Sequence, residues 1–123
     1  MASRYCIAVD WLEVCCYGRD LEPSFFSWEG KHFSVEQEDR ETPLFRSFFV
    51  VKRNGLEWAQ IRQNPKAGIM KKGLTIIKLS NRVLYHEKYV PFLMHMIQAL
   101  GLFYKGLTRL DICYDCNTFY CGR

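Results

Sequence analysis

The run Leu107-Thr-Arg-Leu-Asp-Ile-Cys-Tyr-Asp115 contains the residues whose types and spacing best suit chemistry. Leu, Ile, Thr and Tyr favour strands, and polar and apolar residues alternate with a period of two, so the run predicts a β-strand. Successive side chains of a strand point to opposite faces. One face is therefore shared by Arg109, Asp111, Cys113 and Asp115. Two carboxylates beside an arginine suit a Mg²⁺ or Mn²⁺ ion, a phosphate group or a structural ion pair, and the pattern leaves all three open.

Basic residues are concentrated in the middle third of the chain. The 123 residues have a formal net charge of +4. Residues 1–43 hold 4 Lys and Arg against 9 Asp and Glu, whereas residues 44–88 hold 10 Lys and Arg against 2 Glu. Phe48, Phe49 and Trp58 lie among these cations, and a nucleic-acid surface uses cations for phosphates and flat rings for bases. The alternative is a solvated sheet face whose lysines protect an edge strand.

The residues expected to contact DNA therefore come mainly from this basic region, together with the arginine of the opening run. They are Arg109, Lys52, Arg53, Arg62, Lys66, Lys71, Lys72, Lys78 and Arg82.

Strand-like runs make up most of the regular structure that the sequence predicts. They cover residues 5–17, 32–37, 45–53, 56–62, 74–79 and 107–115. Asn54-Gly55 separates two of these runs, and this dipeptide is the strongest short hairpin signal because both residues of the turn need φ > 0.

One amphipathic helix is expected between His86 and Leu100. Its apolar residues fall at i, i+3, i+4, i+7, i+8 and i+11: Tyr89, Phe92, Leu93, Met96, Ile97 and Leu100. This spacing places them on a single stripe that faces a core. Pro91 fits only the first turn of a helix, and Gly101 fits a C-terminal cap.

The element order predicts an α+β fold, with a mainly antiparallel sheet of about five or six strands and one amphipathic helix packed on one face. A chain of 123 residues fits a single domain, 1–123. No apolar run approaches the roughly 18 residues that a membrane span needs, and the N-terminus shows no signal-peptide pattern. We therefore expect a cytoplasmic protein without a membrane partner.

The six cysteines are expected to be reduced and structural. Cys113 and Cys116 have C-x-x-C spacing, but a zinc site needs a second such pair or nearby histidines. The chain adds only Cys121, and its three histidines are scattered. We expect no zinc.

Two segments resemble rolling-circle replication initiators of the Rep_trans type, which serve small plasmids, phages and conjugative elements. Val9-Asp-Trp-Leu-Glu-Val14 is similar to the early Asp-aromatic-apolar strand of that family, and Leu107–Asp115 is similar to its Arg-x-Asp-x-x-x-Asp strand. Together they cover about an eighth of the chain. The resemblance implies nicking of DNA at a replication origin, through a tyrosine that attacks the phosphodiester while carboxylates hold a divalent ion.

For this chain, the resemblance implies that the carboxylates of Asp111 and Asp115 would bind Mg²⁺ or Mn²⁺, and Asp111 is the stronger candidate. Arg109 would touch phosphate or orient Asp111, and Asp10 would be structural. The nucleophilic tyrosine of the family lies well downstream of this strand, and Tyr120 lacks its helical setting. We therefore expect the N-terminal part of a larger initiator, or a short relative, without nicking activity of its own.

A second hypothesis is a protein-interaction module that self-associates or pairs with another chain through exposed strands. The acidic first third and the basic middle third would allow such association. A stand-alone hydrolase is disfavoured, because no Ser/His/Asp, Cys/His or Gly-rich phosphate-loop constellation is present.

Overall fold

The computed structural model describes residues 6–40, 42–66 and 73–115; of residues 6–8, 10 and 111–115 it describes the backbone alone. Seven strands form one antiparallel sheet in the order β2-β3-β4-β5-β6-β1-β7. The strands are β1 (Cys6–Gly18), β2 (Ser24–Trp28), β3 (Lys31–Glu38), β4 (Phe45–Arg53), β5 (Leu56–Pro65), β6 (Leu74–Leu79) and β7 (Leu102–Asp115). Two helices, α1 (Asn81–Leu84) and α2 (Tyr89–Ala99), connect β6 to β7. Within the described ranges, no helix is long and apolar enough to cross a membrane.

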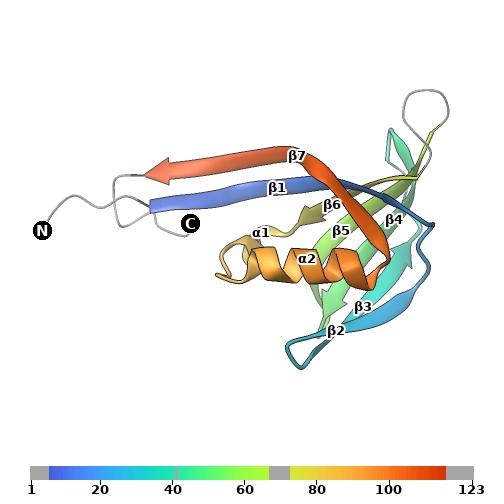
Figure 1. Ribbon diagram of the computed structural model, residues 1–123, viewed down its shortest axis with the longest axis horizontal. Helices are drawn as coiled ribbons and strands as arrows, with labels where there is room; N and C mark the ends of the chain where they lie inside the picture. Colours follow the sequence, from blue (N-terminus) through green and yellow to red (C-terminus); the bar gives the residue numbers. More distant parts are fainter. Residues whose placement is uncertain (1–5, 41, 67–72, 116–123) are drawn as a thin grey trace, which may run out of the picture.

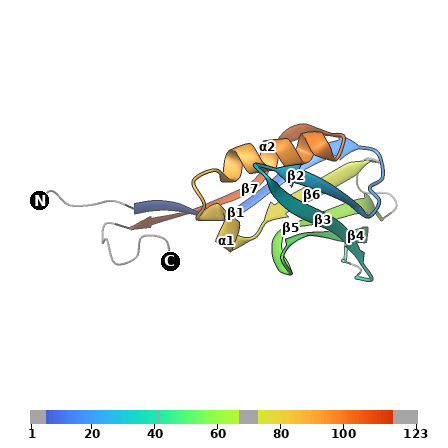
Figure 2. The same ribbon diagram turned by 90° about the horizontal axis from the view of Figure 1, so that it is seen from below.

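The sheet curls into a half-barrel, and α2 lies along its inner side (Figures 1 and 2). The helix contacts both edge strands of the sheet, β7 and β2. At the β2 edge, the Nε2 atom of His95 lies 2.7 Å from the carbonyl oxygen of Ser27. The helix therefore bridges the two edges of the half-barrel and covers part of the β2 edge, which would otherwise present unpaired backbone groups.

The core lies between α2 and the inner face of the sheet. The ring of Phe92 is fully buried and lies 5.0–5.3 Å, centroid to centroid, from the rings of Trp28, Phe33 and Trp58. These three ring pairings, and the pairing of Phe33 with Trp58 beside them, are all edge-on or tilted, which are favourable arrangements for aromatic side chains. The predicted apolar stripe of the helix is confirmed, because five of its six residues are buried and Tyr89 is half-buried.

The expected α+β class and mainly antiparallel sheet are confirmed, but the expected counts are wrong. The structure has seven strands and two short helices, where five or six strands and one helix were expected. The additional strand, β2, lies in a segment that reads as polar and acidic. It pairs with β3 through a tight turn at Glu29-Gly30, where both residues have positive φ. The additional helix, α1, is a single turn of four residues, too short to show a helical period.

The observed bounds of the elements agree best with the predicted bounds where the turn residues are unambiguous. Strands β4 and β6 have the expected bounds, and Asn54 and Gly55 have φ of 52° and 75°, as the predicted hairpin requires. Gly101 follows α2 with a φ of 71°, which confirms its role at the helix end. Strand β7 begins five residues earlier than expected, at Leu102, because it pairs with β1 as far as Gly18.

Strands β1 and β7 extend beyond the rest of the sheet as a two-stranded ribbon (Figure 1). Strand β1 pairs with β6 only over Glu13–Tyr17, whereas its pairing with β7 runs from Cys6 to Gly18. Three register shifts interrupt this pairing. They leave Asp10 in β1 and Lys105 and Thr108 in β7 as extra residues, and such bulges bend a strand and re-aim its side chains.

Two cysteines have described side chains, and both are free thiols. Cys16 is fully buried in the core, whereas Cys15 is half-buried on the other face of β1. Burial raises the pKa of the Cys16 thiol to about 11, with a further contribution from Cys15. Cys16 is thus protonated and unreactive at neutral pH, as a structural cysteine should be. The C-x-x-C pair and Cys121 lie outside the described side chains.

Replacing Phe92 with Ala tests the packing of α2 into the half-barrel. We expect a loss of about 3–5 kcal/mol in the free energy of unfolding, because the change empties a fully buried site among three aromatic rings. Urea unfolding followed by circular dichroism measures it. Val90→Ala, on the solvent side of the same helix, should change stability by only about 0.5 kcal/mol. Equal effects of the two substitutions would contradict this account of the core.

Candidate nucleic-acid interface

Three of the predicted cations come together on the outer face of the sheet, opposite α2. Lys78 of β6 and Arg109 of β7 both lie opposite Glu13 of β1 in the strand register. Directly opposed residues of antiparallel strands share a face, so the three side chains form one row across the sheet. Arg62 of β5 reaches the same row, and its Nη2 atom lies 3.8 Å from Oε2 of Glu13.

Trp11 lies at the centre of this group. The Nζ atom of Lys78 is 3.6 Å from the centroid of the Trp11 ring, and the Cζ atom of Arg109 is 4.0 Å from it. The Nε1 atom of Trp11 donates a hydrogen bond of 2.7 Å to Oε2 of Glu13. We call these five residues, Trp11, Glu13, Arg62, Lys78 and Arg109, the Trp11 cluster.

Both cations lie over the Trp11 ring. The Nζ atom of Lys78 and the Cζ atom of Arg109 are at ordinary van der Waals distance from its centroid. Each such contact contributes about 0.5–1 kcal/mol at an exposed site. Trp11 therefore positions the two cations.

The charge balance of the Trp11 cluster favours an anion. Among the described side chains, three cations surround one carboxylate. Lys78 and Arg109 lie no more than about 8 Å apart, at which two unit charges repel by about 0.5 kcal/mol in water and about 2 kcal/mol at an effective dielectric constant of 20. Arg109 is exposed, and Lys78 and Arg62 are half-buried, so a phosphate can reach them. A bound phosphate would offset the repulsion.

Bulges on both sides of the Trp11 cluster explain why the sequence does not reveal it. The extra residue Asp10 precedes Trp11, and the extra residue Thr108 precedes Arg109. Each extra residue shifts the register by one. The cross-strand partners of Trp11 and Arg109 therefore cannot be found by counting residues along the sequence. Trp11 and Glu13 do share one face at i and i+2, and this alternation is the signal that could have identified them.

Of the other predicted cations, three with described side chains lie at the hairpin end of the sheet, away from the Trp11 cluster. Lys52 pairs with Glu36 at 3.7 Å, and Arg53 precedes the Asn54-Gly55 hairpin. Arg82 of α1 donates a hydrogen bond from Nη2 to the backbone carbonyl of Glu57, which lies opposite Lys52. These three cations thus belong to the hairpin end of the sheet.

The remaining predicted cations follow β5. Lys66 comes directly after this strand and is half-buried, and its backbone N–H donates to the carbonyl of Leu44. Lys71 and Lys72 lie outside the described residues.

The predicted metal carboxylates are placed only by their backbone. Asp111 lies opposite Trp11, and Asp115 lies opposite Cys6, on the projecting ribbon. Their side chains lie outside the described part of the structure. Among the side chains that are described, no group of three or more His, Cys, Asp or Glu is arranged to hold a metal ion.

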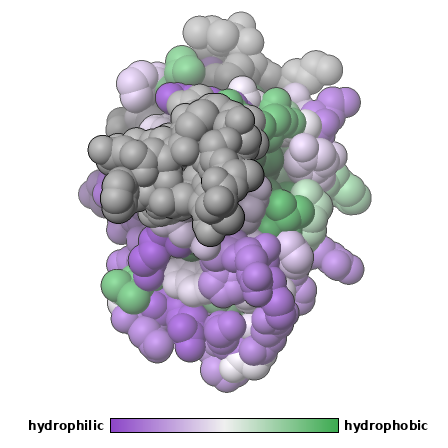
Figure 3. Space-filling view, turned by 90° about the vertical axis from the view of Figure 1, so that its left-hand side faces the viewer, coloured by the Kyte–Doolittle hydropathy of each residue, from purple (hydrophilic) through white to green (hydrophobic). Residues whose placement is uncertain are grey.

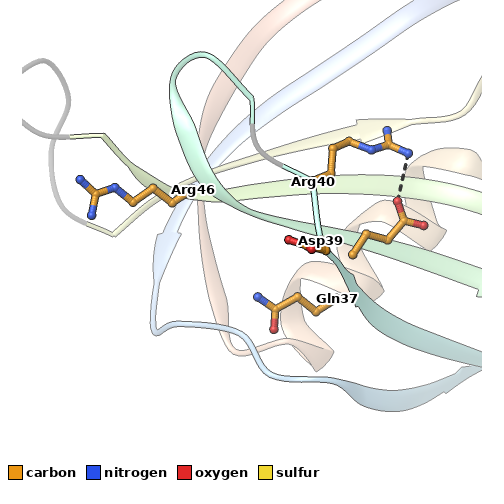
Figure 4. Close-up of a pocket in the computed structure, with 5 residues that line it drawn as sticks. Gln37, Asp39, Arg40 and Arg46 are labelled. Atoms are coloured by element: carbon orange, nitrogen blue, oxygen red, sulfur yellow. Dashed lines mark ion pairs between the residues drawn. The ribbon is translucent and has the colours of Figure 1, made fainter.

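An open hollow lies elsewhere, between β3 and β4 (Figure 4). It measures about 480 Å³ and is lined by Gln37, Glu38, Asp39, Arg40 and Arg46. Arg40 is already paired with Glu38 at 3.0 Å, and its Cζ atom lies 4.4 Å from the Phe48 ring centroid. This hollow is an open surface with charges of both signs. The Trp11 cluster, where three cations converge, is the better candidate site.

Comparisons of the chain with protein-family models, with curated proteins and with solved structures find no match in any of the three.

Replacing Glu13 with Ala tests the Trp11 cluster. Glu13 is only 9% exposed and accepts the indole N–H, so its removal leaves Trp11 and Arg62 without this partner. We expect a loss of about 1–3 kcal/mol in the free energy of unfolding, measured in urea. Glu13→Gln should lose less, because its amide oxygen can still accept from the indole.

The matched control is Glu36→Ala, which breaks an exposed ion pair and should cost at most about 1 kcal/mol. If Glu13→Ala is no more destabilising than Glu36→Ala, the cluster does not have the described structural role.

Proposed function

We propose that this protein is a DNA-binding domain of the rolling-circle initiator type, and that it has no nicking activity of its own. The observation that carries the proposal is the convergence of Arg62, Lys78 and Arg109 around Trp11 on the outer face of the sheet. These cations come from three different strands, and the sequence pattern had marked all three as candidate DNA contacts.

In this proposal the cations of the Trp11 cluster contact the phosphate backbone. Phe103 of β7 adds an aromatic ring that is 75% exposed, and it lies opposite Tyr17 of β1 in the register. Cations that follow the backbone, beside rings on which bases can stack, are the usual combination for binding single strands. A ring this exposed is accessible for such a contact.

The resemblance to initiators assigns further roles, which stay predictions. Asp111 and Asp115 would hold Mg²⁺ or Mn²⁺, and the ion would supply charge to polarise a phosphate. Arg109 would touch that phosphate. Its guanidinium already lies beside Trp11, the residue opposite Asp111, which is a suitable position for this role.

Removing two cations of the Trp11 cluster tests the proposal. We expect Lys78→Ala/Arg109→Ala to weaken binding of a single-stranded oligonucleotide by about tenfold or more at low salt. The log–log salt slope should fall by about 1.4, because each phosphate contact to a single strand contributes about 0.7. Fluorescence anisotropy at several salt concentrations measures both quantities.

Lys88→Ala is the matched control, since it removes one cation from an exposed pair with Glu29 and should leave binding unchanged. Absence of binding by the unmodified protein at low salt, or binding that does not depend on salt, would overturn the proposal.

A second candidate function is pairing with another protein chain through β7. This strand is at the edge of the sheet, and four of its apolar residues are 41–75% exposed: Phe103, Tyr104, Leu107 and Leu110. Seen end-on, hydrophobic residues gather along one side of the molecule beside a mainly hydrophilic surface (Figure 3). The bulges at Lys105 and Thr108 disfavour regular pairing there, so a partner strand would pair beyond them on the projecting ribbon.

Replacing Leu110 with Glu tests this second function, because Leu110 lies beyond both bulges and is 41% exposed. If two copies associate through β7, the charge should abolish self-association because it would be buried in the interface. Sedimentation velocity at low and high salt measures the oligomeric state. Val90→Glu, an exposed apolar residue of α2, serves as the control. A protein that sediments as a monomer under all conditions would argue against self-association.

A further inference from the structure

A second, smaller hollow opens beside the Trp11 cluster. It measures about 290 Å³ and is lined by Trp11, Glu57, Gln60, Lys78, Ser80 and Asn81. Small-molecule pockets range from about 300 to 1,000 Å³, so this hollow suits one small planar group and not a longer ligand. It shares Trp11 and Lys78 with the cluster, and it therefore lies where a bound strand would pass.

The polar groups of the hollow are those that recognise the edge of a base. Gln60 donates one hydrogen bond of 3.0 Å from Nε2 to Oε2 of Glu57, which leaves its amide oxygen and its second N–H for a ligand. Asn81 is exposed, and no partner for its side-chain amide is seen within the described residues. Ser80 differs, because its hydroxyl donates to the carbonyls of Glu57 and Trp58 and has only acceptor capacity left.

The two charges of the hollow differ in sign and set the orientation of a ligand. Lys78 lies in the wall of the hollow next to Trp11, where its ammonium group can contact a phosphate. Glu57 lies in the wall beside Gln60, where its carboxylate repels a phosphate but accepts from an amino group. A nucleotide would therefore enter with its base toward Glu57 and Gln60 and its phosphate toward Lys78 and Arg109.

We propose that this hollow binds one unpaired nucleotide whose base carries an exocyclic amino group, with cytosine preferred over thymine. Glu57 would accept from the amino group, and the amides of Gln60 and Asn81 would contact the remaining base edge. Thymine presents a carbonyl oxygen where cytosine presents an amino group, so it would face the carboxylate unfavourably. A base within a duplex has this edge occupied by its partner, so the site selects single strands.

The proposal rests on the DNA-binding function and adds base preference to it. Anisotropy would compare oligodeoxycytidine with oligodeoxythymidine of equal length. We expect the unmodified protein to bind the cytidine strand about tenfold more tightly, in line with the discrimination of one good polar base contact. Glu57→Gln and Gln60→Ala/Asn81→Ala should remove this preference but keep the salt slope, while Gln98→Ala on α2 should keep both.

Each outcome decides one claim. Equal binding of the two strands, or a preference that survives in both variants, would overturn the base pocket and leave the DNA-binding function standing. Salt-insensitive or absent binding of every strand would instead overturn the DNA-binding function. Direct binding of cytidine monophosphate in calorimetry that is lost in Gln60→Ala/Asn81→Ala, without binding of either strand, would overturn the strand-binding proposal and identify a free nucleotide as the ligand.

Discussion

The structure depends on the packing of α2 against the inner side of the curled sheet. Phe92 anchors this contact among aromatic rings from β2, β3 and β5, and the helix reaches both edge strands. Most buried apolar residues of the strands lie on this inner face, and a smaller apolar cluster of Phe45, Leu74 and Ile76 lies on the outer face. The remaining part of the outer face, around Trp11, carries the charged residues of the candidate site.

Within that polar face, a single aromatic ring organises the charges. Trp11 brings the cations of β6 and β7 to one place. Both lie over its ring, and Glu13 fixes the ring by accepting a hydrogen bond from its indole N–H. The result is a preorganised pair of positive charges, which would lower the entropic cost of binding the proposed phosphate backbone.

Much of this fold could be predicted from the sequence, but the site only in part. The helical spacing of Phe92 and Met96 and the Asn54-Gly55 turn are local signals, and local signals gave α2 and the central hairpin correctly. Strand β2 was missed because its turn, Glu29-Gly30, is less distinctive. The cations were identified by type, yet their convergence depends on bulges and on strand order, which are set by packing across the whole sheet.

The most direct test of this account is an NMR titration of the protein with a single-stranded oligonucleotide at low salt. The indole N–H signals report on the three tryptophans separately. We expect the Trp11 indole signal and the backbone amides of Arg62, Lys78 and Arg109 to shift, because they form the contact surface. The indole signals of Trp28 and Trp58, which lie in the core, should stay in place. Shifts confined to α2 or to the hollow between β3 and β4, with no change at Trp11, would contradict the account.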